Sequence, residues 1–330
     1  MTPVHRLAIV GNGGVSDMHF RGYLAHPERV EIVASVDPSA ERREWVEQSF
    51  GITATFPSIA DAVAGADFDV AVVCTPSHVR LEAVQQLAAA GKHLYVEKPL
   101  ADGVEEARRV VAAAKDAGVL LAVDQNFRYH YAFGQARAAI RAGRIGAVVS
   151  IDQRELQWRE VTGWRAEQVH HALSVMGVHW FDGFRYILGR EADWMVATTH
   201  KSSSLVAAGE TDATVHVRFG DVGVNYTESF SSRLEQVETI VVGETGSLRF
   251  DYDRLEIHTA DGVETVENPW SGDGKPESAY LGLAELLRAI DEGGEPSNSG
   301  SDNLRTLSLL EGAYRSAATG EVVRFENGEL

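Results

Sequence analysis

Lys98 is a side chain whose position in this sequence suits acid–base chemistry. It lies in the sequence Glu97-Lys98-Pro99, directly after the apolar run 93–96, which predicts a buried strand. Ligands of parallel sheets bind beyond the carboxyl ends of the strands. An ammonium group there could stabilise the alkoxide that forms when a secondary alcohol loses hydride. Taken alone, a lysine at a strand end is more often a solvated surface residue.

A glycine-rich turn follows the first apolar run, 7–10, and precedes a segment that predicts a helix. Its sequence is Gly11-Asn12-Gly13-Gly14-Val15-Ser16. In the dinucleotide-binding fingerprint, the first glycine makes the tight turn and the second lets the backbone approach a pyrophosphate. The free N–H groups of the helix then bind that pyrophosphate. The third position of the fingerprint is Gly or Ala, and Ser16 departs from it by one hydroxyl group.

An acidic residue occurs at the distance that this fingerprint requires. Asp37 ends the second apolar run, 32–36, where a carboxylate would accept hydrogen bonds from the adenosine ribose. The alternative is a structural glycine turn with a helix-capping aspartate. Because Asp37 would repel a 2′-phosphate, we expect NAD rather than NADP, although Arg42 and Arg43 could accept that phosphate.

The order of the predicted elements indicates two domains. Five apolar runs alternate with helical segments up to residue 123, which predicts βαβ units and a parallel Rossmann sheet. After residue 124, strand-like segments follow one another from residue 148 to residue 259, joined by turn signals. The predicted fold is therefore α/β, with a doubly wound Rossmann domain over 1–123. A substrate-binding and oligomerisation α/β domain over 124–330 would contain a large open, mainly antiparallel sheet.

The composition excludes several kinds of partner. The chain has 330 residues and a formal net charge of −18, so a nucleic acid or an anionic membrane surface would be repelled. No apolar run is long enough to span a membrane, and the N-terminus does not resemble a signal peptide. The single cysteine, Cys74, lies in an apolar run and is expected in the core. We expect a cytoplasmic protein.

These motifs together resemble the Gfo/Idh/MocA family of NAD(P)-dependent sugar and cyclitol oxidoreductases. The resemblance rests on the glycine-rich turn, Asp37, Thr75-Pro76, Glu97-Lys98-Pro99 and the later Gly177-Val178-His179, with Asp182 following, in this order along the chain. It covers essentially the whole sequence.

The resemblance implies roles for individual residues. Lys98 would be the motif lysine, His179 the general acid and base, and Asp182 a structural neighbour. The implied cofactor-binding residues are Gly11, Asn12, Gly13, Gly14, Val15, Asp37, Thr75, Pro76, His78, Glu97, Lys98 and Asn126. The implied substrate-contacting residues are Lys98, Arg128, Tyr129, Trp164, Arg165, His171 and His179.

One position departs from the family pattern. Val175 stands four residues before His179, where the dehydrogenases of the family commonly carry an aspartate. On a regular helix His171, Val175 and His179 would share one face, so His171 could reach the same pocket. Two turns separate His171 from His179, about 12 Å on a straight helix, which is too far for both to bind one ion. We therefore expect no metal site.

The sequence leaves three functions open. The first is hydride transfer between nicotinamide and a secondary alcohol of a sugar, sugar acid or cyclitol, with His179 moving the proton and Lys98 stabilising the alkoxide. The second is redox-neutral elimination or hydrolysis of a glycoside with recycled bound NAD. The third is a non-enzymatic dinucleotide and sugar sensor. The family's open sheets also imply a homodimer or homotetramer.

Overall fold

The computed structural model describes residues 3–270 and 274–330. The chain forms two compact units, here called unit 1 (Met1–Tyr129 and Lys275–Leu304) and unit 2 (His130–Gly274 and Arg305–Leu330). Unit 1 holds a parallel sheet and unit 2 a mixed, mainly antiparallel one, so the predicted α/β class is confirmed. No helix in the described ranges is long and apolar enough to cross a membrane.

Unit 1 is a Rossmann domain. Its sheet has the strand order β3-β2-β1-β4-β5-β6, and every strand pair is parallel. The strands are β1 His5–Val10, β2 Val30–Val36, β3 Thr55–Phe56, β4 Val70–Val73, β5 His93–Val96 and β6 Leu121–Val123. The helices are α1 Ser16–Leu24, α2 Ala40–Phe50, α3 Ile59–Gly65, α4 Arg80–Ala89, α5 Val104–Asp116 and α8 Lys275–Glu292, with the short 3-10 turns η1 Ser77–Val79 and η2 Asn126–Tyr129.

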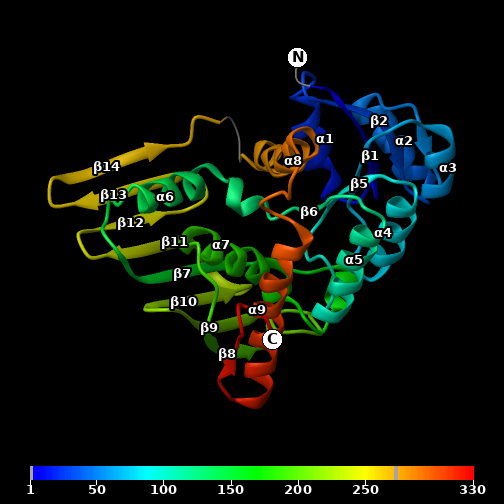
Figure 1. Cartoon of the computed structure of the whole chain (residues 1–330). Helices are drawn as coiled ribbons and strands as arrows, with labels where there is room; N and C mark the ends of the chain where they lie inside the picture. Colours follow the sequence, from blue (N-terminus) through cyan, green and yellow to red (C-terminus); the bar gives the residue numbers. More distant parts are fainter. Residues whose placement is uncertain (1–2, 271–273) are drawn as a thin grey trace. The chain divides into compact units, whose positions relative to one another are not determined.

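The carboxyl ends of five strands in this sheet are level. Their last residues form one row of paired positions, in the order Val36, Val10, Val73, Val96 and Val123. The residues that follow them therefore leave the sheet at one common edge: Asp37, Gly11, Cys74, Glu97 and Asp124. The strands β1, β4 and β5 are hydrogen-bonded neighbours in this sheet, of which Figure 1 labels β1, β2, β5 and β6.

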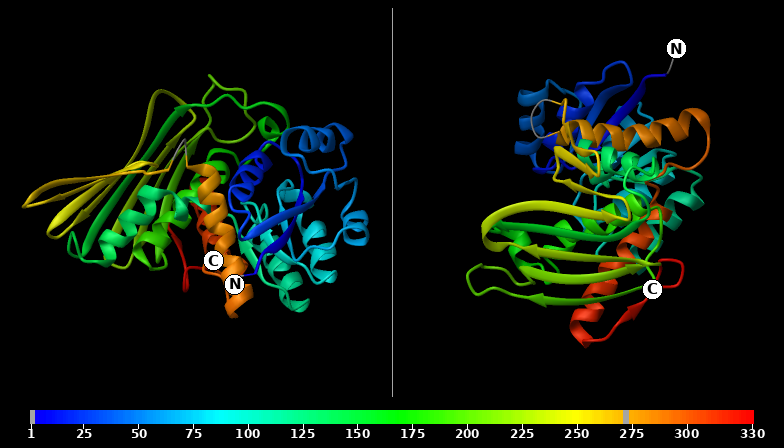
Figure 2. Two further views of the ribbon diagram at one scale, coloured as in Figure 1. Left: turned by 90° about the horizontal axis from the view of Figure 1, so that it is seen from above. Right: turned by 90° about the vertical axis from the view of Figure 1, so that its left-hand side faces the viewer.

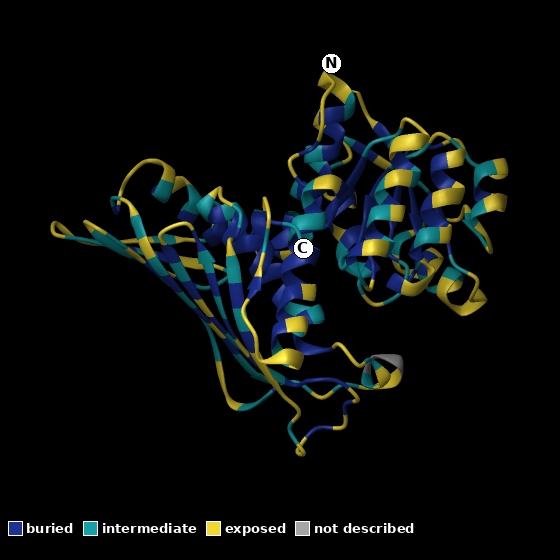
Figure 3. Cartoon of the chain, turned by 60° about the horizontal axis from the view of Figure 1, so that its bottom comes forward, coloured by how far each residue is buried: buried dark blue, intermediate teal, exposed yellow. Residues whose placement is uncertain are grey.

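The core of unit 1 explains why its strands lack polar alternation. β4 is buried at all four positions, as expected for a parallel strand covered on both faces. Its helices are buried on one side and exposed on the other (Figure 3). Cys74 is buried among these apolar side chains, as predicted. Helix α8 packs against α1 and η2, so a segment distant in sequence belongs to this unit.

Unit 2 is built on a nine-stranded sheet with the order β14-β13-β12-β11-β7-β10-β9-β8-β15. The central pair β7 and β10 is parallel, and its other neighbours pair antiparallel. The strands are β7 Val148–Trp158, β8 Trp194–His200, β9 Asp212–Phe219, β10 Val222–Ser229, β11 Ser231–Gly243, β12 Gly246–Phe250, β13 Arg254–Thr259, β14 Gly262–Glu267 and β15 Val323–Arg324. The helices are α6 Tyr131–Arg141, α7 Val178–Leu188 and α9 Gly300–Thr319, with the short 3-10 turn η3 Gly163–Glu167; α9 begins in unit 1.

Helices α6 and α7 cover the same face of this sheet (Figure 2). The helix before α7 is not the regular one that the sequence suggested, because residues Leu173–Gly177 form a π-helical turn, η4, that continues into α7. A π turn inserts extra residues per turn. The equal spacing predicted for His171, Val175 and His179 on one α-helical face therefore does not hold.

Candidate active site

The turn after β1 requires a glycine at position 11. Gly11 has φ +94°, a conformation that L side chains rarely adopt, and a Cβ there would lie 3.0 Å from the backbone of Cys74 and Thr75. Ser16, the departure from the fingerprint, is buried and donates its hydroxyl to the carbonyl of Gly13 at 2.7 Å. The hydroxyl group is thus satisfied within the turn that it closes.

Asp37 is fixed at the end of β2 by the same turn. Its carboxylate accepts the backbone N–H of Asn12 and that of Ser39, each at 2.8 Å. Asn12 is itself buried and accepts the hydroxyl of Ser35 at 2.9 Å. Because each carboxylate oxygen has two lone pairs, Asp37 retains acceptor capacity for further hydroxyl groups.

The turn also fits a dinucleotide. A Cβ on Gly13 or Gly14 would meet no atom within 4 Å, so the packing of the chain does not itself demand glycine there. Helix α1 begins directly after them, with Val15 at its N-cap position and no side-chain cap there, and helix N-termini offer N–H groups to anions. A pyrophosphate at Gly13 and Gly14 and a ribose diol at Asp37 are the groups that these residues would hold.

The loops after β4 and β5 are tied together by Arg80. Its buried guanidinium group donates to the carbonyls of Thr75 and Pro99. Burial lowers the pKa of Arg80 to about 10, so the group stays charged at neutral pH. Arg80 thereby holds together two of the loops predicted to contact the cofactor. Of the other residues predicted there, Pro76 and His78 are exposed.

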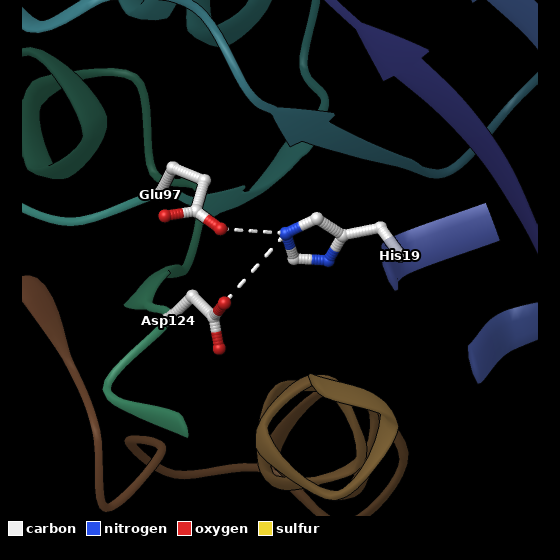
Figure 4. A group of neighbouring side chains, drawn as sticks. All are labelled: His19, Glu97 and Asp124. Carbon is white, nitrogen blue, oxygen red and sulfur yellow. Dashed lines mark hydrogen bonds and ion pairs between the residues drawn. The ribbon is translucent and has the colours of Figure 1, made fainter. Parts of the chain in front are cut away.

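A buried network of His19, Glu97 and Asp124 lies at the same edge of the sheet (Figure 4). His19 Nε2 lies 2.7 Å from Glu97 Oε1 and 3.6 Å from Asp124 Oδ2. Its Nδ1 lies 2.7 Å from the Tyr23 hydroxyl. The second oxygen of Glu97 accepts the backbone N–H of Lys98 at 3.1 Å. This network therefore extends from helix α1 to the backbone of the motif lysine.

The charges in this network balance without an added ion. Burial alone would lower the pKa of His19, but Tyr23, Cys74 and Glu97 outweigh it and raise that pKa well above its ordinary value. Burial would raise the pKa of Glu97, but the hydrogen bond and charge of His19 lower it to about 2. Burial and the neighbouring Glu97 raise the pKa of Asp124 to about 8. At neutral pH the three groups are an imidazolium, a carboxylate and a neutral acid.

This network also has the composition of a metal site. The three side chains offer ligand atoms within 4.8 Å of one another. Both ring nitrogens of His19 are, however, already engaged by Tyr23 and Glu97. A histidine must be neutral and must free one nitrogen to bind a metal. We therefore interpret the network as an ion pair that supports the loop of Lys98.

The remaining predicted residues of unit 1 lie in η2. Asn126 is buried, and its amide nitrogen lies 3.9 Å from the sulfur of Met18. Arg128 donates to the carbonyl of Ser297 at 2.8 Å and to Asp302 Oδ2 at 2.5 Å. Tyr129 is half-buried. The guanidinium group of Arg128 is thus engaged in anchoring the loop before α9.

In unit 2, His179 is buried in the first turn of α7. Asp182, one turn later, is fully buried and accepts the hydroxyl of Thr306 at 2.9 Å. Arg185 lies 3.6 Å from the same oxygen and also pairs with Glu191 at 2.7 Å. Asp182 is therefore held in an internal network that joins α7 to α9.

The two adjacent histidines before η4 point to different surroundings. His170 stacks on Tyr314 with 3.9 Å between ring centroids, whereas His171 is buried against Phe230 at 5.3 Å. The backbone N–H of His171 donates to both carboxylate oxygens of Glu210, at 3.0 and 2.9 Å. Glu210 also accepts the N–H of Leu173 at 3.0 Å, so it caps the segment that begins this helix.

A hollow of about 140 Å³ in unit 2 contains two of the positions singled out from the sequence. It is lined by Arg159, Glu160, Val161, Thr162, His171 and Val175. His171 and Val175 thus share one wall despite the π turn between them. The predicted Trp164 and Arg165 belong to η3, but their side chains lie outside the described part of the structure.

Sequence reasoning missed several buried polar residues. Asp124 follows a buried strand directly, as Asp37 does, so this signal was available in the sequence. His19 had no such signal, because its partners Glu97 and Asp124 are far away along the chain. Glu228 occupies a position of β10 where the alternating pattern predicts an apolar side chain, and that alternation could have revealed it.

Comparison with known families decides the relationship. A model of the oxidoreductase family with an NAD-binding Rossmann fold, Gfo/Idh/MocA, matches residues 5–125, and a model of the Gfo/Idh/MocA C-terminal domain matches residues 133–249. The chain belongs to the Gfo/Idh/MocA family. The predicted family is confirmed, and the chain is an NAD(P)-dependent oxidoreductase acting on CH–OH groups.

Sequence relatives agree with this assignment, and a solved structure shares the fold. The chain is 30% identical to D-apiose dehydrogenase of Paraburkholderia graminis, over 98% of this chain and 90% of the relative. It is 27% identical to inositol 2-dehydrogenase of Rhizobium meliloti, over 95% and 97%. An oxidoreductase from Agrobacterium radiobacter, solved with NAD+, L-tartaric acid and magnesium, has the same fold, with a TM-score of 0.89, 24% identity and coverage of 97% and 98%.

Proposed function

We propose that this protein oxidises a secondary alcohol of a sugar, sugar acid or cyclitol with NAD, and catalyses the reverse reduction. Held at Gly13, Gly14 and Asp37, NAD would supply the hydride acceptor for the carbinol carbon. His179 takes the proton of the hydroxyl group, and the ammonium group of Lys98 stabilises the alkoxide that develops on the oxygen. Atoms and charge balance, because the alcohol loses one hydride and one proton.

The observation that carries this proposal is the level edge of the parallel sheet in unit 1. It brings the glycine turn at Gly11, the carboxylate of Asp37 and the loop of Lys98 to one edge of the sheet, at the ends of β1, β2 and β5. That edge is where α/β sheets bind dinucleotides. The contact from Lys98 N–H to Glu97, which His19 fixes in turn, supports a defined position for the Lys98 backbone.

We propose NAD as the preferred dinucleotide. Asp37 retains acceptor capacity for two ribose hydroxyls, whereas a 2′-phosphate would meet its negative charge. The nearby Arg43 donates to the backbone carbonyls of Asp37, at 2.7 Å, and Pro38, at 3.0 Å. Its engagement there favours a structural role over phosphate binding.

The named substrates of the relatives support a sugar or cyclitol with a secondary hydroxyl group as the substrate. Those named above act on apiose and inositol, and levoglucosan dehydrogenase shares the fold, with a TM-score of 0.87 in its complex with NADH and levoglucosan. Apiose, inositol and levoglucosan all carry secondary hydroxyl groups. We infer a substrate of this chemical class.

The proposal is tested by assaying NADH formation over a panel of sugars, sugar acids and cyclitols, with NADP as the alternative cofactor. Lys98→Ala should lower kcat by about a thousandfold, because it removes a charge that acts on the transition state. Its NAD affinity, measured by NADH fluorescence titration, should stay within about threefold. The matched control is Lys115→Ala, an exposed lysine in the last turn of α5, which should retain wild-type turnover.

Two results would contradict this assignment. Retained turnover in Lys98→Ala would remove Lys98 from the reaction. Product formation by the wild-type protein without release of one NADH per product would indicate that bound NAD is recycled, as in redox-neutral elimination or hydrolysis of a glycoside.

A further inference from the structure

The helical run that contains His179 is capped by a glutamate from a later part of the chain. The run starts at Ala172, passes through the π turn η4 and continues as α7. A helix leaves its first four N–H groups without partners inside the helix. Here the N–H of His171 donates to Glu210 Oε1 at 3.0 Å and Oε2 at 2.9 Å. The N–H of Leu173 donates to Oε1 at 3.0 Å, and that of Ala172 to the Glu210 carbonyl at 3.2 Å.

The next N–H group is bound through the same glutamate. Ser174 N–H donates to the Tyr314 hydroxyl at 3.1 Å, and this hydroxyl donates to Glu210 Oε1 at 2.8 Å. Glu210 is only 8% exposed, and a buried carboxylate needs hydrogen-bond donors of this kind. A negative charge is also favourable at the N-terminus of a helix. Glu210 and Tyr314 together therefore bind four successive N–H groups at the start of the run.

Glu210 is itself held in a fixed place next to the sheet. The following residue, Thr211, is buried, and its N–H donates to the carbonyl of His200, the last residue of β8, at 2.9 Å. The preceding residue, Gly209, passes close to the segment before the helical run. A Cβ on Gly209 would lie 2.7 Å from the carbonyl oxygen of Gln168. Glu210 therefore ties the start of the helical run to the end of β8.

One residue that Glu210 binds also holds the next turn. The carbonyl of Leu173, whose N–H donates to Glu210, accepts the N–H of Val178. This bond spans five residues, which is the pattern of a π turn. Val178 directly precedes His179, the residue proposed to move the proton. A chain of hydrogen bonds thus leads from the carboxylate of Glu210 to the first turn of α7.

The π turn gives this anchor a consequence for geometry. A π turn is rare, and it holds more residues than the α-helical turn that it replaces. Relaxation to a regular α-helix would shift one flank of the turn by one residue, about 100° around the helix axis. This shift would rotate His171 and Val175, which line the hollow, relative to His179. Because the N–H groups at the start of the run are bound to Glu210, outside the helix, they oppose this rotation.

We infer that Glu210 is a positioning residue for His179, because it holds the register of the π turn from which α7 starts. This inference rests on the proposed function, in which His179 is the acid and base of the reaction. Glu210 acts through the backbone of the helical run and contacts neither substrate nor cofactor in this role. A general base must lie within hydrogen-bond reach of the hydroxyl group that it deprotonates, so a register error there lowers kcat.

The test makes the same substitution at the two ends of one helical run. Glu210→Gln removes the charge and one acceptor oxygen at the start, with little change in volume. The control, Glu191→Gln, alters the glutamate that pairs with Arg185 in the last turn of α7, at 2.7 and 2.9 Å. Turnover is expressed per NAD-binding site, counted by NADH fluorescence titration, so unfolded protein does not contribute. With the best substrate of the sugar and cyclitol panel, kcat per site should fall about thirtyfold in Glu210→Gln and less than about threefold in Glu191→Gln.

The KM for NAD should stay within about threefold in both variants, because the dinucleotide residues belong to unit 1. A milder variant, Tyr314→Phe, removes the hydroxyl that links Ser174 to Glu210, and should lower kcat per site by about three- to fivefold. It carries the same comparison if Glu210→Gln yields no folded protein. An unchanged kcat per site in Tyr314→Phe would then overturn the inference.

Hydrogen–deuterium exchange reads the anchor without turnover. In Glu210→Gln the amides of residues 171–179 should exchange about tenfold faster, and those of residues 185–188 should stay within about twofold. Glu191→Gln should leave residues 171–179 unchanged. Unchanged exchange there in Glu210→Gln would overturn the inference.

The two measurements separate this inference from the proposed function. Wild-type turnover that Glu210→Gln leaves unchanged per site, or that Glu191→Gln lowers equally, would overturn the inference and leave the proposed function standing. A wild-type protein that forms no NADH on the whole panel would overturn the proposed function. Exchange over residues 171–179 would then decide by itself whether Glu210 fixes the segment of His179.

Discussion

The two units bury carboxyl groups in opposite ways. In unit 1, Glu97 is kept ionised by His19, and Asp124 beside them holds a proton. In unit 2, Glu155 faces neutral donors from Trp180, Tyr252 and Gln157, and its neighbour Glu228 holds a proton. Each site therefore places two buried carboxyl groups together and raises the pKa of one of them, but among the described residues only in unit 1 does a histidine lie within 4 Å of both carboxyl groups.

The difference indicates what each site does. An ion pair with both histidine nitrogens engaged is rigid, and it is connected to the Lys98 backbone through Glu97. The buried carboxyl groups of unit 2 are instead held by neutral side chains, with Trp180 and Tyr252 donating to Glu155 and Tyr226 donating to Glu228. We interpret the first site as a support for the lysine loop and the second as an internal network that joins β7 to α7.

The largest effect is expected from a substitution that breaks the ion pair of unit 1. His19→Leu leaves the Glu97 carboxylate buried without its cationic partner, which should lower the free energy of unfolding by about 3–5 kcal/mol. Urea denaturation at neutral pH measures this change. His78→Leu, at an exposed position, is the control and should change it by less than about 0.5 kcal/mol. A loss of under about 1 kcal/mol in His19→Leu would contradict the ion pair.

The next largest effect concerns Asp124, the protonated carboxyl group of unit 1, and is a change in the pH dependence of stability. The pKa of Asp124 is about 8 in the folded protein, against an ordinary value of 3.8. The folded state therefore retains a proton that the unfolded chain releases, so wild-type stability falls as pH rises through this window. Asp124→Asn keeps a neutral side chain and removes the contribution of Asp124 to this pH dependence of stability. Its stability relative to wild type should increase by about 1 kcal/mol per pH unit between pH 5 and 7.

Thermal or urea unfolding of both proteins across this range gives the comparison directly. Taking the difference between variant and wild type cancels the titration of His19 and other groups that both share. A difference that stays constant with pH, or that falls, would show that Asp124 is ionised in the folded protein.

The smallest expected effect tests the neutral acid of unit 2. Glu228→Gln exchanges a protonated carboxyl group for an uncharged group of the same shape, so unfolding free energy at pH 7 should change by less than about 1 kcal/mol. Glu155→Gln is the informative counterpart, because it removes the charge that Trp180 and Tyr252 hold. Glu155→Gln should lower the free energy of unfolding by more than Glu228→Gln does. Equal decreases in the two variants would contradict the assigned protonation states.

Much of the fold was predictable because local patterns determine it. The apolar runs with glycine-ended helices predicted the parallel sheet, and the spacing from Gly11 to Asp37 predicted the dinucleotide turn. The arrangement around Val175 was not predictable, because the π turn at Leu173–Gly177 leaves no signature in hydrophobic periodicity. Pairings such as Glu155 with Glu228 depend on strand order, which single-strand patterns do not specify.

The most direct test of the central claim follows the hydride itself. The wild-type protein is incubated with NAD and a neutral polyol deuterated at the carbinol carbon that is oxidised, and the NADH formed is analysed by mass spectrometry and NMR. We predict that the deuterium appears at C4 of the nicotinamide ring, in one NADH per ketone formed. Deuterium that remains in the product, or that is lost to water without labelled NADH, would contradict the proposed reaction.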